Sequence, residues 1–162
     1  MTSFPKFKKY VVIGAGVHGL STAWHLAKEL KARGKGSGED IVVLDKTGVA
    51  AGASGIACGV IRNFYYQPAM GEVMRISVRV WEENERDFHY NPVGYLAVTG
   101  PVQQRDLETI FERQQNSGYH SDLILGEEQV YNYMRAMFPD WKARGLTACL
   151  HEKQGGFAFN KP

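Results

Sequence analysis

The sequence predicts an α/β fold that begins with a strand, a helix and a second strand. Residues 9–13 contain the apolar run YVVI, which does not alternate with polar residues and so predicts a buried strand. In residues 17–33, apolar side chains such as Leu20, Trp24 and Leu30 recur at helical spacing. A second apolar run, IVVLD at residues 41–45, predicts another buried strand. This order predicts two parallel strands joined by a right-handed crossover.

The remainder of the chain predicts further helices and strands. Helices are expected at residues 68–89, 101–117 and 127–137, and strands at residues 94–99, 122–126 and 147–150. The apolar stripe of the first of these helices, which includes Met70, Val73 and Trp81, predicts a face packed in the core. Residues 34–40, residues 47–59 and the C-terminal QGGFAFNKP predict segments without regular structure, because they are rich in glycine and other small residues.

Composition and charge exclude several functional classes. With 162 residues, 44% of them hydrophobic and 22% charged, the chain is typical of a globular protein without a membrane span. A formal net charge of +2 is too small to indicate nucleic-acid binding. Cys58 and Cys149 form no CxxC pair, and His18 and His25 have no other ligand at metal-binding spacing. We therefore expect no disulfide and no metal site, and a cytoplasmic location.

Three glycines between the first strand and the first helix indicate a dinucleotide site. Gly14, Gly16 and Gly19 form a GxGxxG motif, in which the glycines allow a tight turn, approach to a pyrophosphate and close packing of the helix. The phosphates would lie at the positive end of the helix dipole. Asp45, at the end of the second strand, could bind a ribose diol. The motif predicts a Rossmann-like unit but does not separate FAD from NAD.

The next segment, GVAAGASGIACGVIRNFYY at residues 48–66, resembles the loop after the second strand in FAD-dependent oxidoreductases of the D-amino-acid oxidase superfamily. The stretches GVIRNFYYQPAM, NPVGYLAVTG and RQQNSG extend the resemblance. Within the superfamily, the sequence most resembles the branch of sarcosine oxidase and dimethylglycine dehydrogenase. It implies FAD as the cofactor. It also implies an N-terminal part of an FAD-binding domain at residues 1–66, followed by a helix-rich insertion and the start of a substrate domain at residues 67–162. Because those enzymes are longer, the chain is expected to be an incomplete portion of a two-domain flavoenzyme.

The resemblance assigns cofactor roles to individual residues. The backbone of the glycine motif would hold the pyrophosphate, Asp45 the ribose, and Lys46 would lie beside the adenine. Ala53 and Ser54 would approach the phosphates, and the small residues that follow would pass close to the isoalloxazine ring. The implied FAD-binding residues are Gly14, Ala15, Gly16, Val17, His18, Gly19, Asp45, Lys46, Ala53, Ser54, Cys58, Gly59 and Val60.

The resemblance also implies an activity. It predicts the oxidation of a secondary or tertiary amine, such as an N-methyl amino acid, by transfer of a hydride equivalent to the flavin to give an imine. Arg62 is the candidate catalytic residue, because an arginine at this place in similar amine oxidases pairs with the substrate carboxylate, which its guanidinium can bind through two hydrogen bonds. The expected partner is a small amine or amino acid, and the isolated chain is expected to be inactive.

Two other functions remain open at the level of sequence. The strand, helix and strand with their glycine motif also suit an NAD-dependent dehydrogenase. A dinucleotide-binding or assembly fragment without catalytic activity would likewise keep the glycine motif. Bound flavin would favour the first interpretation over an NAD enzyme.

Overall fold

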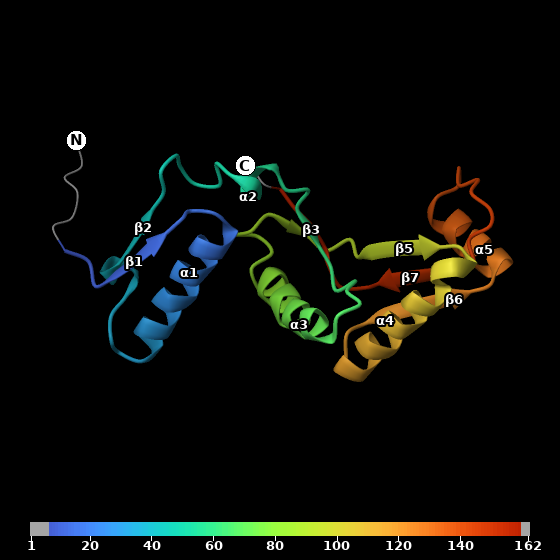
Figure 1. Ribbon diagram of the computed structural model, residues 1–162, viewed down its shortest axis with the longest axis horizontal. Helices are drawn as coiled ribbons and strands as arrows, with labels where there is room; N and C mark the ends of the chain where they lie inside the picture. The colour runs from blue at the N-terminus through green and yellow to red at the C-terminus, as the bar shows by residue number, and fades with distance from the viewer. Residues whose placement is uncertain (1–6, 160–162) are drawn as a thin grey trace. The chain divides into compact units, whose positions relative to one another are not determined.

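The computed structural model describes residues 7–159, which form two compact units (Figure 1). The first unit comprises residues 7–58, and the second comprises Gly59–Phe159. Both units contain helices and strands, so the predicted α/β class is confirmed. The predicted boundary after Tyr66 concerns the cofactor and substrate domains, and it stays a prediction.

The first unit contains the predicted strand, helix and strand. Strands β1 (Tyr10–Ile13) and β2 (Ile41–Leu44) pair in parallel, with Tyr10 opposite Ile41 and Ile13 opposite Leu44. Helix α1 (Val17–Ala32) connects them and is followed by a short 3-10 helix, η1 (Gly38–Asp40). The crossover between two parallel strands is therefore confirmed, while the segment before β2 is more regular than predicted.

The strands of the first unit are more exposed than their apolar sequence predicts. Val11 is 55% exposed and Ile13 is 88% exposed, so the prediction of buried strands is wrong here. Successive strand side chains point to opposite faces of a sheet. Val12 faces α1, where its side chain is 3.5 Å from the position of a Cβ at Gly19, whereas the alternate residues face away from the helix.

The small-residue segment of the first unit also folds locally. Helix α2 (Ala53–Ile56) has four residues and lies within residues 47–59, where no regular structure was predicted. An ideal Cβ at Gly55 would lie 2.1 Å from the carbonyl oxygen of Ala50, so only glycine lets this turn close. Ala50 itself has a positive φ of 54°. The missed helix thus depends on a backbone approach that composition alone does not reveal.

The second unit contains two antiparallel sheets of three strands. In one sheet β5 (Tyr95–Thr99) and β6 (Ser121–Leu125) flank β7 (Ala148–Glu152), which confirms the three strands predicted from the sequence. In the other sheet β3 (Val60–Ile61) and β4 (Tyr90–Asn91) flank β8 (Gly156–Ala158), and none of these was predicted. A Cβ at Gly156 would lie 2.0 Å from the carbonyl oxygen of Asn91, so β8 needs its glycine to pair with β4.

The helices of the second unit are α3 (Pro68–Glu83), α4 (Gln104–Ser117) and α5 (Glu127–Met137). A 3-10 turn, η2 (Pro101–Gln103), precedes α4. The prediction that the first helix extends to residue 89 is wrong. The side chain of Asn84 donates a hydrogen bond of 2.7 Å to the carbonyl oxygen of Val80, and such a contact competes with continuation of the helix.

Helices cover both faces of the β5-β7-β6 sheet (Figure 1). Leu107 and Ile110 of α4 pack against Leu150 on one face, and Val130 of α5 packs against Cys149 on the other. This arrangement follows from the alternation of side chains along β7.

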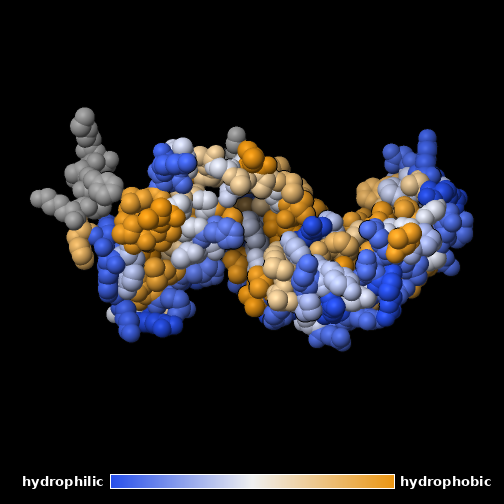
Figure 2. Space-filling model, viewed as in Figure 1, coloured by the Kyte–Doolittle hydropathy of each residue, from blue (hydrophilic) through white to orange (hydrophobic). Residues whose placement is uncertain are grey.

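Helix α3 packs through Val78, which is fully buried with Tyr90 and Tyr119. Of the predicted stripe, Trp81 contacts this cluster, but Met70 and Val73 are 40% and 56% exposed. Apolar side chains also reach the surface elsewhere in both units (Figure 2).

A carboxylic acid is buried among the apolar residues of the second unit. Glu152 is 0% exposed, and its side chain accepts hydrogen bonds from the N–H of Asn63 at 2.9 Å and from Nε2 of Gln114 at 2.6 Å. The hydroxyl of Tyr119 lies 3.3 Å away. Burial raises the pKa of Glu152 to about 7, although these three donors oppose the shift.

We predict that Glu152→Gln changes how stability depends on pH. The folded-state pKa of Glu152, about 7, exceeds its ordinary value of 4.5. Between these two pH values the folded protein therefore holds a proton that the unfolded chain has released. The stabilisation is complete below the ordinary pKa and is lost as the pH rises through the folded-state pKa. The difference in unfolding free energy between E152Q and the unaltered protein should therefore shift by up to about 3 kcal/mol in favour of E152Q between about pH 5 and about pH 8.

Urea unfolding followed by circular dichroism measures this difference. Glu83→Gln, at the exposed end of α3, is the matched control and should leave the pH dependence unchanged. Equal pH profiles for E152Q and the unaltered protein would contradict the prediction.

Candidate functional site

The turn between β1 and α1, residues 14–19, has the geometry that its glycines predict; we call it the glycine-rich turn. Gly14 has a φ of +107°, and its N–H donates a hydrogen bond of 2.7 Å to the carbonyl oxygen of Leu44 at the end of β2. An ideal Cβ at Gly19 would lie only 1.9 Å from the carbonyl oxygen of Gly14. The first glycine therefore makes the turn, and the third lets α1 pack against it.

The beginning of α1 presents backbone N–H groups that have no protein acceptor. Gly16 caps the helix without a side-chain hydrogen bond, and the N–H of Val17 donates to Oγ of Ser54 at 2.9 Å. Within residues 7–159, the N–H groups of Gly16, His18 and Gly19 have no acceptor. The first turn of α1 contains no acidic residue, so the positive end of the helix dipole is not offset there. This arrangement fits a diphosphate.

Asp45 connects the glycine-rich turn to the segment after β2. Its Oδ2 accepts a hydrogen bond of 2.9 Å from the N–H of Ala15, and its Oδ1 accepts bonds from the N–H and hydroxyl of Thr47 and from the N–H of Gly48. These bonds, the one from Ala15 most of all, hold the pKa of Asp45 well below its usual range. Among residues 7–159, only the N–H of Ala15 donates to Oδ2, so this oxygen can accept a further hydrogen bond. The sequence predicted a ribose contact but not this connection.

The other predicted cofactor residues differ in their surroundings. The hydroxyl of Ser54 reaches the glycine-rich turn, whereas the neighbouring Ala53 is exposed at the start of α2. Lys46 and Cys58 are exposed, and the described residues show no hydrogen bond from either to the turn. Gly59 and Val60 belong to the second unit, where Gly59 accepts a backbone bond from β8 and Val60 begins β3.

Arg62 occupies an aromatic site in the second unit. It follows β3 directly, and its Nη1 donates a hydrogen bond of 2.6 Å to the hydroxyl of Tyr95. The guanidinium lies 5.0 Å from the ring centroid of Tyr95, 5.7 Å from that of Phe64 and 5.6 Å from that of Tyr65, which permits cation–π interactions. Among the residues that the structure describes, no carboxylate forms an ion pair with Arg62. We call Arg62 and its three aromatic neighbours, Phe64, Tyr65 and Tyr95, the arginine site.

The β5-β7-β6 sheet holds the arginine site in place. Tyr95 and Glu152 are opposite each other on β5 and β7, so their side chains lie on the same face. Tyr95 binds Arg62, and Glu152 binds the N–H of Asn63, the next residue. Sequence reasoning missed Glu152 and Tyr95. One available signal was the segment ACLHE, in which alternation places Glu152 on the face of Leu150.

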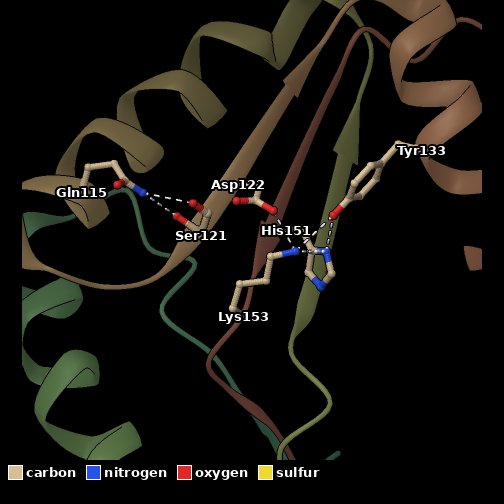
Figure 3. A network of polar contacts seen from close by, with 6 residues as sticks. All are labelled: Gln115, Ser121, Asp122, Tyr133, His151 and Lys153. Atoms are coloured by element: carbon tan, nitrogen blue, oxygen red, sulfur yellow. Dashed lines mark hydrogen bonds and ion pairs between the residues drawn. The ribbon is translucent and has the colours of Figure 1, made fainter.

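A second polar cluster lies on the opposite face, near α5 (Figure 3). The hydroxyl of Tyr133 is 2.7 Å from Nδ1 of His151, and Nζ of Lys153 is 3.0 Å from the same nitrogen. Lys153 also forms a 2.8 Å ion pair with Asp122. Burial lowers the pKa of His151, and the charge of Lys153 lowers it further. Figure 3 shows these side chains meeting between α5 and the sheet, where they join α5 to β6 and β7.

The described residues contain neither a candidate metal site nor a candidate membrane-spanning helix. Within residues 7–159, no group of three or more histidine, cysteine, aspartate or glutamate side chains could hold a metal ion. Both cysteines are free, and burial raises the pKa of Cys149 to about 11. No helix in this part of the chain is both long enough and apolar enough to cross a bilayer.

Solved structures share the fold. The chain is similar to L-proline dehydrogenase from P. horikoshii, with a TM-score of 0.80 and 22% identity over 97% of this chain and 39% of that one. Glycine oxidase from Bacillus cereus ATCC 14579 gives a TM-score of 0.70 at 21% identity over 96% and 40% of the two chains. L-amino acid deaminase from Proteus myxofaciens gives a TM-score of 0.74 at 19% identity over 99% and 35%. At these identities the likeness establishes the fold alone.

Sequence comparison establishes the family. The sarcosine oxidase subunit beta of Rhizobium meliloti (strain 1021) is 32% identical over 103 residues, which are 61% of this chain and 23% of that protein. The chain thus spans about a quarter of this curated relative. The family of FAD dependent oxidoreductases known as DAO matches residues 9–161, and this match confirms the predicted resemblance and FAD as the cofactor. The chain belongs to the DAO family of FAD-dependent oxidoreductases.

Proposed function

We propose that this chain binds the diphosphate of FAD at the glycine-rich turn, as part of an oxidoreductase that acts on a small amine or amino acid. The main support is the set of N–H groups of Gly16, His18 and Gly19, which have no acceptor in the described part of the chain. They lie at the positive end of α1, where an anion is stabilised. FAD, when bound, supplies the acceptor for the hydride equivalent that the substrate loses.

The remaining cofactor roles follow from this position of the diphosphate. Oδ2 of Asp45 would accept a hydrogen bond from a ribose hydroxyl in addition to the one from Ala15. Lys46 would lie beside the adenine, and Ala53 with Ser54 beside the phosphates. We propose that Cys58, Gly59 and Val60 leave room for the flavin ring, because their side chains are small. We also propose that residues 1–66 form the N-terminal part of an FAD-binding domain, and that residues 67–162 form a helix-rich insertion and the start of a substrate domain.

Arg62 is the proposed anchor for a substrate carboxylate. Its guanidinium is half-buried, bonds to the neutral hydroxyl of Tyr95 and has no ion-pair partner among residues 7–159. A guanidinium can bind a carboxylate through two hydrogen bonds. We propose an N-methyl amino acid as the substrate, because the curated relative is named a sarcosine oxidase subunit. Loss of a hydride equivalent from the carbon next to nitrogen would give an imine, which water hydrolyses.

We predict that Gly16→Val weakens FAD binding by at least about tenfold, or about 1.4 kcal/mol. An ideal Cβ at Gly16 lies 3.1 Å from Oγ of Ser54, so a branched side chain would crowd the N–H groups at the start of α1. Flavin absorbance after equilibrium dialysis against FAD measures the effect.

Gly38→Ala is the control for this substitution. A Cβ at Gly38 would make an ordinary 3.7 Å contact with Ala27, and Gly38 lies in η1 rather than in the glycine-rich turn. FAD binding should remain unchanged in G38A. Undiminished FAD binding by a folded G16V variant would contradict the proposed phosphate site.

We predict that Arg62→Ala weakens the binding of a carboxylate ligand by about 1.5 to 3 kcal/mol, the usual contribution of a hydrogen bond to a charged group. Arg62→Lys should recover only part of this loss, because an ammonium lacks the planar pair of donors. Calorimetric titration of the FAD-loaded protein with propionate measures both effects.

Arg86→Ala provides the matched control, because Arg86 is an exposed arginine of the same unit outside the arginine site. It should bind propionate as the unaltered protein does. If R62A also keeps its affinity, Arg62 does not bind the carboxylate.

A further inference from the structure

One pair of opposite residues in the β5-β7-β6 sheet fixes two consecutive residues of another segment. Tyr95 of β5 and Glu152 of β7 face each other in the register of the sheet. The hydroxyl of Tyr95 accepts the hydrogen bond from Nη1 of Arg62 at 2.6 Å, and the carboxylate of Glu152 accepts the N–H of Asn63 at 2.9 Å. This one cross-strand pair therefore holds both the guanidinium of Arg62, through Tyr95, and the backbone after Arg62, through Glu152.

Within the described residues, the other side-chain hydrogen bonds of Glu152 come from an amide and a hydroxyl. Nε2 of Gln114 donates to its Oε1 at 2.6 Å, and the same Nε2 lies 3.1 Å from the carbonyl oxygen of Asn63. The hydroxyl of Tyr119 donates to Oε2 at 3.3 Å. No cation forms an ion pair with Glu152 in the described part of the chain. Arg62 is the cation whose charge favours its ionised form, at a distance longer than an ion pair.

We propose that Glu152 is a positioning residue for Arg62, and that it takes up a proton from solvent when a carboxylate ligand binds to Arg62. This inference rests on the proposed role of Arg62 as a carboxylate anchor. Glu152 acts through the backbone of Asn63 and through its charge, without touching the ligand.

The coupling follows from electrostatics in a buried site. A ligand carboxylate at Arg62 offsets the positive charge that favours ionised Glu152, so the pKa of Glu152 rises. A proton from solvent then binds to a carboxylate oxygen of Glu152, and the side chain becomes neutral. Linkage is reciprocal, so ionised Glu152 must weaken ligand binding by the same factor. Because burial raises the pKa of Glu152 to about 7, this change occurs near neutral pH.

Other titratable groups near Glu152 do not account for such a change. Burial and the charge of Glu152 raise the pKa of Tyr119 far above neutral pH. Tyr90, which borders Tyr119, has a pKa raised to about 12 by burial and by Glu82. Gln114 of α4 and Ser121 of β6 carry no charge, and the hydroxyl of Tyr95 of β5 accepts the hydrogen bond from Arg62. His151 precedes Glu152 and lies on the opposite face of the sheet.

The test measures proton uptake directly. Propionate is titrated calorimetrically into the FAD-loaded protein at about pH 7 in two buffers that differ in ionisation enthalpy. We expect uptake of a fraction of one proton per bound propionate, and a dissociation constant that rises about two- to tenfold from about pH 6 to about pH 8.5. Propionate itself stays ionised over this range.

Two Glu152 variants separate its charge from its hydrogen bond. Glu152→Gln keeps an oxygen that can accept the N–H of Asn63, so it should bind propionate at pH 6 as tightly as the unaltered protein, without proton uptake or pH dependence. Glu152→Ala removes the acceptor and should weaken binding at every pH. Glu83→Gln, exposed at the end of α3, should leave uptake unchanged.

Tyr119→Phe keeps the proposal testable if a Glu152 variant does not fold. It removes a donor that favours ionised Glu152, so the pH dependence of propionate binding should move to higher pH. If the unaltered protein binds propionate through Arg62 without proton uptake, or if E152Q keeps the uptake, the coupling is wrong while the carboxylate anchor stands. If Arg62→Ala binds propionate normally, the anchor itself is wrong.

Discussion

The first unit depends on a close backbone contact between Gly14 and Gly19, which leaves no room for a side chain at position 19. The carbonyl oxygen of Gly14 occupies the place where a Cβ of Gly19 would stand, at 1.9 Å from that position. Any larger residue at position 19 would push α1 away from the turn and would move the N–H groups that face outward. The bond between Asp45 and the N–H of Ala15 holds the same turn from the side of β2. The proposed diphosphate site is therefore shaped by backbone packing and by this hydrogen bond.

The second unit is held together in part by a buried acid, Glu152. Removing a carboxylate from water is costly unless donors replace the water, and here the three donors come from Asn63, Gln114 and Tyr119. They belong to three separate parts of the chain, so the acid fixes those parts relative to one another. A neutral glutamine could make part of this network, whereas the acid adds a proton-binding group next to the backbone that carries Arg62.

Short-range requirements were predictable from the sequence, and long-range ones were not. The roles of Gly14 and Gly19 in the turn follow from local steric rules, and the strands and helices with clear periodicity were found. Strands β3, β4 and β8 have two or three residues, too few for a period to show. Glu152 contacts Asn63 across 89 positions of sequence, so its role becomes visible only in the fold. Arg62 was identified through a family resemblance, but its aromatic neighbours were not.

The hydrogen-bond partner of Arg62 is compatible with its proposed role as a carboxylate anchor. A carboxylate bonded to Arg62 would compete with any incoming anion, and it would neutralise the charge on which recognition depends. The hydroxyl of Tyr95 orients the guanidinium by accepting its hydrogen bond, and the surrounding rings stabilise the cation without offering a carboxylate. The carboxylate of Glu152 could compete with a ligand for Arg62, but it accepts hydrogen bonds from Asn63, Gln114 and Tyr119 instead. In the proposed coupling, protonation of Glu152 removes the remaining negative charge that would oppose an anion at Arg62, so the affinity of the arginine site for a carboxylate would rise as the pH falls.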